Sequence, residues 1–325
     1  MSGVTVITGG AGYIGAAATQ ELLNAGRKVR VFDVLLHGQD DIAKSLEDMG
    51  AEVIRGDIRD GEARRTALEG ADALVHLAAI VGDPACALDP KVSDEINVGG
   101  SQALVVDAKA AGVQRLVFAS TCSNYGRMAD PTVPITEEGE LRPVSLYAEQ
   151  KVGIENAMLG SDLNGLKPTC LRFATIYGVA PRMRFDLTVN EFTRDLWADK
   201  ELEVFGEKFW RPYVHVRDAG RAIRTALEAP ADKVDHEVFN VGRSGENYRK
   251  LDIVNEIQKK LDSGKVNYVH RDEDPRDYKV SFDKVRDVLG FETTMTVPDG
   301  IGEVADALSA GSFPDPFDSS YRNVP

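Results

Sequence analysis

Residues 4–15 read Val4-Thr5-Val6-Ile7-Thr8-Gly9-Gly10-Ala11-Gly12-Tyr13-Ile14-Gly15, a short apolar run that leads directly into glycines. Gly9, Gly12 and Gly15 are three residues apart, so no side chains crowd the turn, and backbone N–H groups can approach a pyrophosphate at the start of a helix. In this pattern Gly9 permits the tight turn, Gly12 the close approach, and Gly15 the packing of the helix on the sheet. We therefore expect a dinucleotide site here, with Tyr13 and Ile14 beside the ligand. Taken alone, the stretch is also compatible with a purely structural turn.

A second apolar run, Val29-Arg30-Val31-Phe32-Asp33, ends in a carboxylate 18 residues beyond Gly15. An acid near this distance from the glycines binds the ribose hydroxyls of an adenosine. Because a carboxylate repels a 2′-phosphate, Asp33 favours NAD over NADP as the cofactor.

The composition excludes several classes of protein. The 325 residues can form one large domain or two smaller ones, and 38 basic against 52 acidic residues give a net charge of −14. General attraction to nucleic acid or to an anionic membrane is therefore not expected. No run of 18 uncharged apolar residues occurs and no basic leader precedes the first strand, so we expect a cytoplasmic protein. Three scattered cysteines, Cys86, Cys122 and Cys170, indicate neither a disulfide scaffold nor a metal site.

Short apolar runs, the pattern of buried strands, alternate with longer segments of helical pattern. The runs lie at 4–8, 28–33, 52–55, 72–78, 114–119 and 166–173, and the helical segments lie at about 12–26, 39–50, 60–69, 91–112 and 145–160. This alternation predicts an α/β fold with a doubly wound parallel sheet of the Rossmann type, covered by helices on both faces.

The rhythm changes after Gly178, where a basic loop begins. We expect an NAD-binding domain over 1–178, to which 212–240 returns, and a smaller discontinuous substrate lobe formed by 179–211 and 241–325. The chain from Gly311 onwards is rich in Pro and Gly and lacks a helical period, so it should extend over the surface.

Tyr147 and Lys151 are the first candidates for chemistry, because residues four apart share one face of a helix. A tyrosine of ordinary pKa is only about 0.1% phenolate at pH 7, a deficit of about 4 kcal/mol. A nearby ammonium and the positive charge of the nicotinamide can remove much of that deficit, and Lys151 can also hold the nicotinamide ribose. A solvent-facing helical pair is the alternative, since the motif by itself is common.

The segment from Leu116 to Gly126 ends the fifth strand at its carboxyl edge, where open α/β sheets bind ligands. A hydroxyl of Ser120, Thr121 or Ser123 at this edge can bond to the reacting oxygen and shorten the proton path to Tyr147. The alternative is that these hydroxyls only cap a strand-to-loop turn.

Taken together, these motifs resemble the extended short-chain dehydrogenase/reductases, in particular the nucleotide-sugar epimerases and dehydratases typified by UDP-glucose 4-epimerase. The resemblance covers nearly the whole chain. Its motifs occur in order as Thr8-Gly9-x-x-Gly12-x-x-Gly15, Gly56-Asp57-Ile58, Val75-His76-Leu77-Ala78-Ala79, Asn97-Val98-x-Gly100, Ser120-Thr121 to Tyr125-Gly126, Tyr147-x-x-x-Lys151, Leu171-Arg172-Phe173 to Tyr177-Gly178 and Arg211-Pro212-Tyr213-Val214-His215-Val216.

The resemblance implies a role for each matched position. Thr121, Tyr147 and Lys151 correspond to the catalytic triad. The implied cofactor contacts are Asp57 and Ile58 at the adenine and Leu77, Ala78 and Ala79 at a strand end. The implied phosphate contacts of the substrate are Arg211 and Arg271, with Arg182, Arg184 and Arg276 as further candidates for the same pocket. The resemblance also implies a homodimer that pairs through helices near 91–112 and 145–160, and it leaves Asn97 as a brace between helix and sheet.

Several positions depart from the family pattern. The family's 4,6-dehydratases carry Asp-Glu directly after the threonine, whereas this chain has Cys122 and Ser123, neither of which is a good acid near pH 7. Cys122 is one place away from the cysteine acid of related 3,5-epimerases, and we expect it to be a small buried filler. Gln150 replaces the usual Ser or Thr. Thr175 and Asp186 occupy positions where 4-epimerases have asparagines that hold the sugar nucleotide. The sequence therefore does not identify the nucleotide of the substrate.

These features predict an NAD-dependent epimerase that acts at C4 of a nucleotide-diphosphate sugar through a transient 4-keto intermediate. An NDP-4-keto-sugar reductase or oxidoreductase needs the same early steps and is the first alternative. A dehydratase that lacks the Asp-Glu pair is another, and a non-enzymatic dinucleotide sensor is the least favoured because it has no need of the triad.

Overall fold

The structure, a computed structural model, describes residues 3–128, 130, 132–262, 265–269 and 276–323. Its centre is a sheet of seven parallel strands in the order β10-β6-β5-β4-β1-β2-β3. The strands are β1 (Val4–Thr8), β2 (Lys28–Asp33), β3 (Glu52–Arg55), β4 (Ala71–His76), β5 (Arg115–Thr121), β6 (Lys167–Phe173) and β10 (Glu237–Val241). This order reverses at β1 and β4, as in a doubly wound fold, and confirms the predicted fold class.

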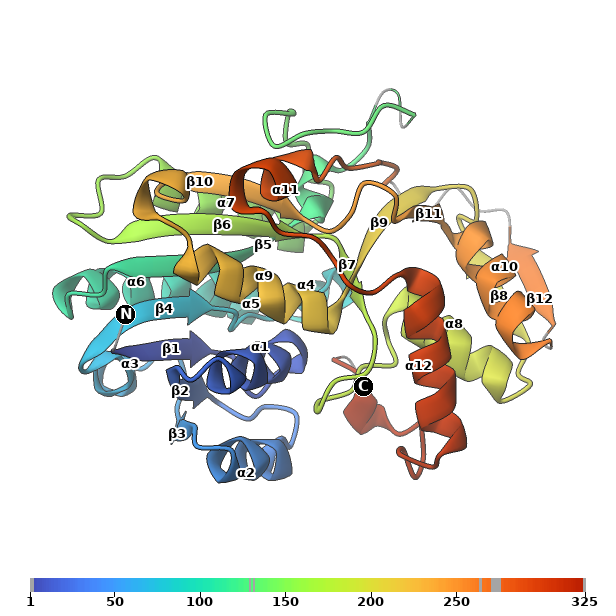
Figure 1. Cartoon of the computed structure of the whole chain (residues 1–325), viewed down its shortest axis with the longest axis horizontal. Coiled ribbons are helices and arrows are strands. Elements are labelled where there is room, and N and C mark those ends of the chain that lie inside the picture. Colours follow the sequence, from blue (N-terminus) through green and yellow to red (C-terminus); the bar gives the residue numbers. More distant parts are fainter. Residues whose placement is uncertain (1–2, 129, 131, 263–264, 270–275, 324–325) are drawn as a thin grey trace.

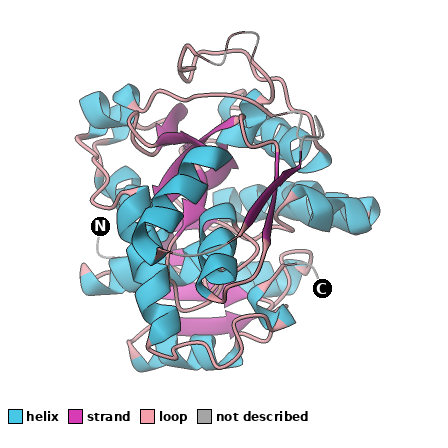
Figure 2. Ribbon diagram, turned by 90° about the vertical axis from the view of Figure 1, so that its right-hand side faces the viewer, coloured by secondary structure: helices cyan, strands magenta, loops and turns pink. Residues whose placement is uncertain are grey.

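Helices cover both faces of this sheet, as Figure 2 shows. They are α1 (Tyr13–Asn24), α2 (Asp40–Asp48), α3 (Gly61–Leu68), α4 (Asp83–Leu88), α5 (Pro90–Asp94), α6 (Ser101–Ala110), α7 (Leu146–Leu159), α9 (Val216–Glu228) and α11 (Asp283–Leu289). In Figure 1, α1 and α9 lie side by side on one face, and they are in contact. Apolar side chains of the strands are buried on both faces, which explains why the strands read as continuous apolar runs.

The helical segment expected over about 91–112 is confirmed, but it is not α-helical throughout. Pro90 begins α5, a π-helical turn follows over Glu95–Gly100, and α6 continues from Ser101. The π-helical turn carries Asn97, whose side chain accepts from Ile80 N at 2.8 Å and donates to Ile80 O at 3.0 Å. These bonds confirm that Asn97 braces this helix against the chain that leaves β4.

A smaller body lies beyond the carboxyl ends of the parallel strands, at the right of Figure 1. It contains β7 (Thr175–Tyr177), β9 (Trp210–His215) and β11 (Asn247–Arg249) in one sheet, and β8 (Leu202–Phe205) with β12 (Val266–Val269) in another. Its helices are α8 (Thr188–Trp197), α10 (Lys250–Leu261) and α12 (Val297–Ser309), which enclose an apolar cluster of their own. The two bodies therefore meet at the edge of the sheet where an α/β fold binds its ligand.

The chain after Gly311 is not merely extended over the surface, as we expected. Phe313 and Tyr321 pack against the buried Phe185, and Ser319–Tyr321 form a 3₁₀ turn. These aromatic contacts hold the segment against the smaller body, although its sequence has no helical period. Within the described ranges, no helix has the length and apolarity that crossing a bilayer requires.

Candidate active site

A cavity of about 360 Å³ lies at the carboxyl ends of β1, β4, β5 and β6, between the two bodies. Most residues predicted for cofactor or substrate line it. They are Gly9, Gly12, Tyr13, Ile14, Gly15, Asp33, Asp57, Ile58, Leu77, Ala78, Ala79, Thr121, Ser123, Tyr147, Lys151, Thr175, Arg182 and Arg184. Residues as far apart in sequence as Gly9 and Asn323 thus converge on one site.

The glycine loop leaves space where side chains would stand. Gly9 has φ = 70°, and a Cβ on it would lie 2.8 Å from Ala78 N. A Cβ on Gly15 would clash with the Gly9 carbonyl oxygen. Gly12 is the N-cap of α1 and provides no side-chain cap, so the first N–H groups of the helix remain available to a ligand. This loop and helix start fit the pyrophosphate of NAD.

Asp33 ends β2 at the cavity wall. Its Oδ2 accepts from Ala11 N and its Oδ1 from Leu35 N, both at 2.9 Å. Burial raises the pKa of this carboxyl, while the backbone N–H groups oppose that rise. Each oxygen keeps a second lone pair, so the carboxylate can still accept from ribose hydroxyls.

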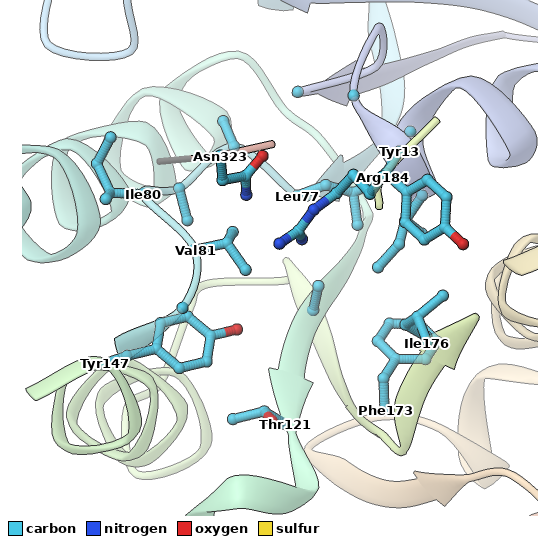
Figure 3. Close-up of a pocket in the computed structure, with 18 of the residues that line it drawn as sticks. Tyr13, Leu77, Ile80, Val81, Thr121, Tyr147, Phe173, Ile176, Arg184 and Asn323 are labelled. Atoms are coloured by element: carbon cyan, nitrogen blue, oxygen red, sulfur yellow. The ribbon is translucent and has the colours of Figure 1, made fainter. Parts of the chain in front are cut away.

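Tyr147 and Lys151 reach the cavity from α7, which begins after the N-cap Ser145. Lys151 Nζ donates to the Ala119 carbonyl at 2.8 Å and lies 5.8 Å from the centre of the Tyr147 ring. Burial lowers the pKa of Lys151 to about 8 and raises that of Tyr147 above its ordinary value. Figure 3 shows the Tyr147 hydroxyl directed into the cavity from α7 and Thr121 on the neighbouring strand.

Thr121 has a structural and a ligand-facing role at once. Its Oγ1 accepts from Ser123 N at 3.1 Å, which caps the 3₁₀ turn Cys122–Tyr125, and the residue also lines the cavity. Thr121 therefore caps the turn, as the alternative interpretation expects, and it also lies in the site.

A buried polar network holds α7 against the sheet behind these residues. Glu155, two turns after Tyr147, forms an ion pair with Arg172 of β6. It also accepts from Ser120 Oγ at 2.6 Å. Lys151, Glu155 and their partners thus attach α7 to both β5 and β6, which sets the position of Tyr147 relative to Thr121.

Gln150 serves a similar purpose on the other side of α7. Its Oε1 accepts from Asn97 Nδ2 at 2.8 Å and from Ser93 Oγ at 2.9 Å. The Gln150 side chain, which replaces the family's usual Ser or Thr, therefore faces the neighbouring helices. Its longer amide connects α7 to the region of α5.

Among the described residues, two positions that the resemblance relates to the substrate, Asp186 and Arg211, do not line the cavity, and neither does Cys122. Cys122 is buried, its Sγ lies 3.2 Å from the Arg172 carbonyl oxygen, and burial raises the pKa of its thiol. Asp186 pairs with Arg184 at 2.8 Å, and the buried Arg211 lies over the Tyr278 ring at 5.2 Å. Arg271 lies outside the described residues.

Sequence reasoning missed other lining residues. Ile80, Val81, Gly82 and Asp83 continue from the end of β4, so the rule that ligands bind at carboxyl strand ends could have found them. Arg276, named only as a further candidate, lines the cavity and pairs with Asp83 at 3.0 Å. Tyr278 and Asn323 also line it, and no sequence pattern marks either of them.

Comparisons with known proteins agree with this geometry. Residues 5–242 match the model of the NAD dependent epimerase/dehydratase family. A UDP-glucose 4-epimerase of Lactobacillus helveticus is 31% identical over 310 residues, which cover 88% of this chain and 91% of that protein.

Two solved structures have nearly the same fold. A UDP-glucose 4-epimerase of Thermotoga maritima, solved with UDP-glucose, has a TM-score of 0.85 at 26% identity and covers 95% of this chain and 100% of its own. The dTDP-glucose 4,6-dehydratase DesIV of Streptomyces venezuelae, solved with NAD, has a TM-score of 0.84 at 27% identity and covers 95% and 98%. The chain therefore belongs to the NAD dependent epimerase/dehydratase family and is an NAD-using enzyme of the extended short-chain dehydrogenase/reductase type.

Proposed function

We propose that this enzyme epimerises C4 of a nucleotide-diphosphate sugar through a transient 4-keto intermediate. The observation that carries the proposal is that the Tyr147 and Thr121 side chains share one cavity with the glycine loop and Asp33. NAD supplies a hydride acceptor at C4 and then returns the hydride, so the sugar undergoes no net oxidation.

Tyr147 takes the proton from the C4 hydroxyl in this proposal, while Thr121 Oγ1 holds the same oxygen. Burial works against the phenolate of Tyr147, and the charge of Arg184 lowers its pKa. Lys151 adds a second cation over the Tyr147 ring and can also bind the nicotinamide ribose. The two cations make the proton transfer easier at neutral pH.

The sugar nucleotide would meet residues of the smaller body and the loop after β5. Ser123 and Thr175 offer hydroxyls to the sugar, and Arg184 with Arg276 offers charge-assisted donors to the diphosphate. The Tyr278 and Ser123 side chains are hydrogen-bonded to each other at this end of the cavity. The phosphate contacts that the resemblance implies for Arg211 and Arg271 remain part of this proposal.

Dehydration is disfavoured by the position of Cys122. The thiol faces the Arg172 carbonyl and not the cavity, and burial raises its pKa, so it cannot act as the acid that removes a C6 hydroxyl. Ser123 does line the cavity, but a hydroxyl is a poor acid near pH 7.

We further propose a cytoplasmic homodimer. Leu88, the last residue of α4, and Val106 on α6 expose 68% and 64% of their surface on the helical layer that carries α7, and a partner copy would cover them. Residues 1–178 with 212–240 would form the NAD-binding domain, since β10 pairs with β6 and α9 packs on α1. The remaining segments, 179–211 and 241–325, would form the substrate lobe. Two details differ from these bounds, since β7 and β9 pair in the sheet of the smaller body and α11 packs on β10 of the large sheet.

The test is mass spectrometry of UDP-, dTDP-, GDP- and CDP-sugars incubated with the purified protein in deuterated water, without added cofactor, followed by separation of epimers. We expect a new epimer of unchanged mass with no deuterium on carbon. Loss of 18 mass units, or carbon-bound deuterium, would instead establish elimination or enolisation. Consumption of added NADH or NAD in proportion to product would establish a reductase or oxidoreductase.

A further inference from the structure

The segment 312–323 forms part of the cavity wall, although it is distant in sequence from the other cofactor residues. Asn323 lines the cavity together with Asp33, His37 and Arg182. Figure 3 shows the Asn323 amide and the Arg184 guanidinium directed into the same space. The segment therefore meets the cavity with a polar side chain.

Contacts outside the cavity anchor this segment to the basic loop 179–187. Phe185 N donates to the Tyr321 carbonyl at 2.9 Å, and Asn323 N donates to the Asp186 carboxylate at 3.0 Å. The Tyr321 ring packs edge-on against Phe185 and Phe313, with ring centres 5.6 Å apart in each case. Tyr321 itself does not line the cavity, so it contributes packing and not ligand contact.

Arg182 joins the segment to the cofactor end of the cavity. Its Nη1 donates to Asn323 Oδ1 at 2.7 Å and its Nη2 donates to the Arg322 carbonyl at 3.1 Å. Its Nε is buried and has no hydrogen-bond partner among the described residues. A cavity-lining guanidinium with an unused buried donor is suited to a ligand oxygen, because buried donors in folded proteins are nearly always paired.

The position of Asp33 identifies which half of the dinucleotide would meet Arg182. The cradle formed by Gly9, Gly12 and Gly15 fits the pyrophosphate, and Asp33, at the end of the next strand, fits the adenosine ribose. Arg182 and Asp33 both line the cavity, and the charge of Arg182 lowers the pKa of Asp33 against the effect of burial. Burial lowers the pKa of Arg182 to about 10, which leaves it charged at neutral pH.

We propose that segment 312–323 is a retaining wall of the NAD site, in which Arg182 and Asn323 contact the adenosine half of NAD and the anchored segment slows its release. The proposal depends on the NAD site and not on the sugar reaction. A wall of this kind suits a catalyst whose cofactor returns its hydride in place and has no need to leave between turnovers.

The test measures NAD release from the purified holoenzyme without any sugar. The protein is loaded with NAD labelled in the adenine ring, excess unlabelled NAD is added, and the loss of label is followed with time. Asn323→Ala removes the contact with Arg182, and Tyr321→Ala removes the anchor outside the cavity. We expect each variant to release NAD at least tenfold faster than the unaltered protein.

Asn267→Ala and Tyr268→Ala are matched controls, because they remove the same residue types from β12, away from the cavity. Both should release NAD within twofold of the unaltered rate. Circular dichroism and thermal melting identify any variant that fails to fold. If Tyr321→Ala fails to fold, the release rate of Asn323→Ala tests the proposal. Release from folded Asn323→Ala within twofold of the unaltered rate would overturn the proposal. Because sugar is absent, this result is independent of whether the enzyme is an epimerase.

Discussion

Lys151 Nζ lies 5.8 Å from the centre of the Tyr147 ring while it donates to the Ala119 carbonyl at 2.8 Å. The main chain of β5 therefore fixes the ammonium beside the tyrosine that reaches into the cavity from α7. The pair is not a solvent-facing helical pair, because the Lys151 side chain is buried. This arrangement leads to the first two predictions.

Replacing Tyr147 with Phe should remove the group that exchanges the C4 proton. The ring and its packing are conserved, so we expect NAD to remain bound while kcat falls by about 10²–10⁴-fold, the usual contribution of a positioned acid or base. Epimer formation measured alongside NAD content checks this result. Turnover close to that of the unaltered enzyme would mean that another group moves the proton.

The pKa of Lys151, lowered by burial to about 8, predicts an alkaline limit to activity. As pH rises through about 8 the ammonium loses its charge and no longer assists Tyr147, so kcat/KM should fall. Lys151→Met should have kcat reduced about 10- to 100-fold and should lack this alkaline limb. An identical limb in Lys151→Met would assign it to a different group.

The stability of the folded protein should rise with pH over the same alkaline range in which kcat/KM falls. The folded pKa of Lys151 lies below the ordinary lysine value of 10.5, so between about 8 and 10.5 the unfolded chain holds a proton that the folded protein has released. The contribution of this group to the free energy of unfolding therefore rises with pH in that window, by up to about 1.4 kcal/mol per pH unit. Urea unfolding of the unaltered protein and of Lys151→Met at several pH values isolates the contribution.

Much of the cofactor site could be predicted from sequence because local chemistry specifies it. The glycine spacing, the acid that ends β2 and the carboxyl ends of the strands all follow from backbone geometry, and the structure brings Gly9, Asp33 and Ala78 to one cavity. Asn323 and Tyr278 could not be found in this way. Their places depend on how a long irregular chain packs on the smaller body, and neither position has a periodic pattern or a fixed offset from a motif.

Two further expectations are confirmed, although their details depend on turns that a sequence pattern does not mark. Cys122 is buried, as expected of a small filler, in the 3₁₀ turn that Thr121 caps. The helical segment expected over about 91–112 contains a π-helical turn, because one extra residue in the turn cannot be seen in an apolar pattern of period 3.6.

The glycine loop allows a matched pair of substitutions. Gly15→Ala places a Cβ against the Gly9 carbonyl oxygen, so the loop must open. We expect this variant to purify with at least tenfold less NAD. Gly153→Ala, in α7, meets no atom within 4 Å and should instead raise the free energy of unfolding by about 0.5–1 kcal/mol. Similar NAD contents in the two variants would contradict the proposed role of the loop.

The last prediction concerns the buried ion pair of Glu155 with Arg172. It tests whether a residue that does not touch the substrate positions the catalytic helix. Their side chains are 1% and 5% exposed, so Glu155→Gln leaves the Arg172 charge without its partner in the interior. Removing one member of a buried pair costs about 3–5 kcal/mol, and urea unfolding should show a loss of this size.

The exposed pair of Glu140 with Arg142 is the matched control, and Glu140→Gln should leave stability unchanged. If Glu155 also positions α7, then Glu155→Gln should lower kcat more than it raises KM, because Tyr147 shifts relative to Thr121 while the substrate ligands stay in place. A Glu155→Gln variant as stable and as active as Glu140→Gln would show that the network behind the catalytic helix holds neither the fold nor the geometry of the site.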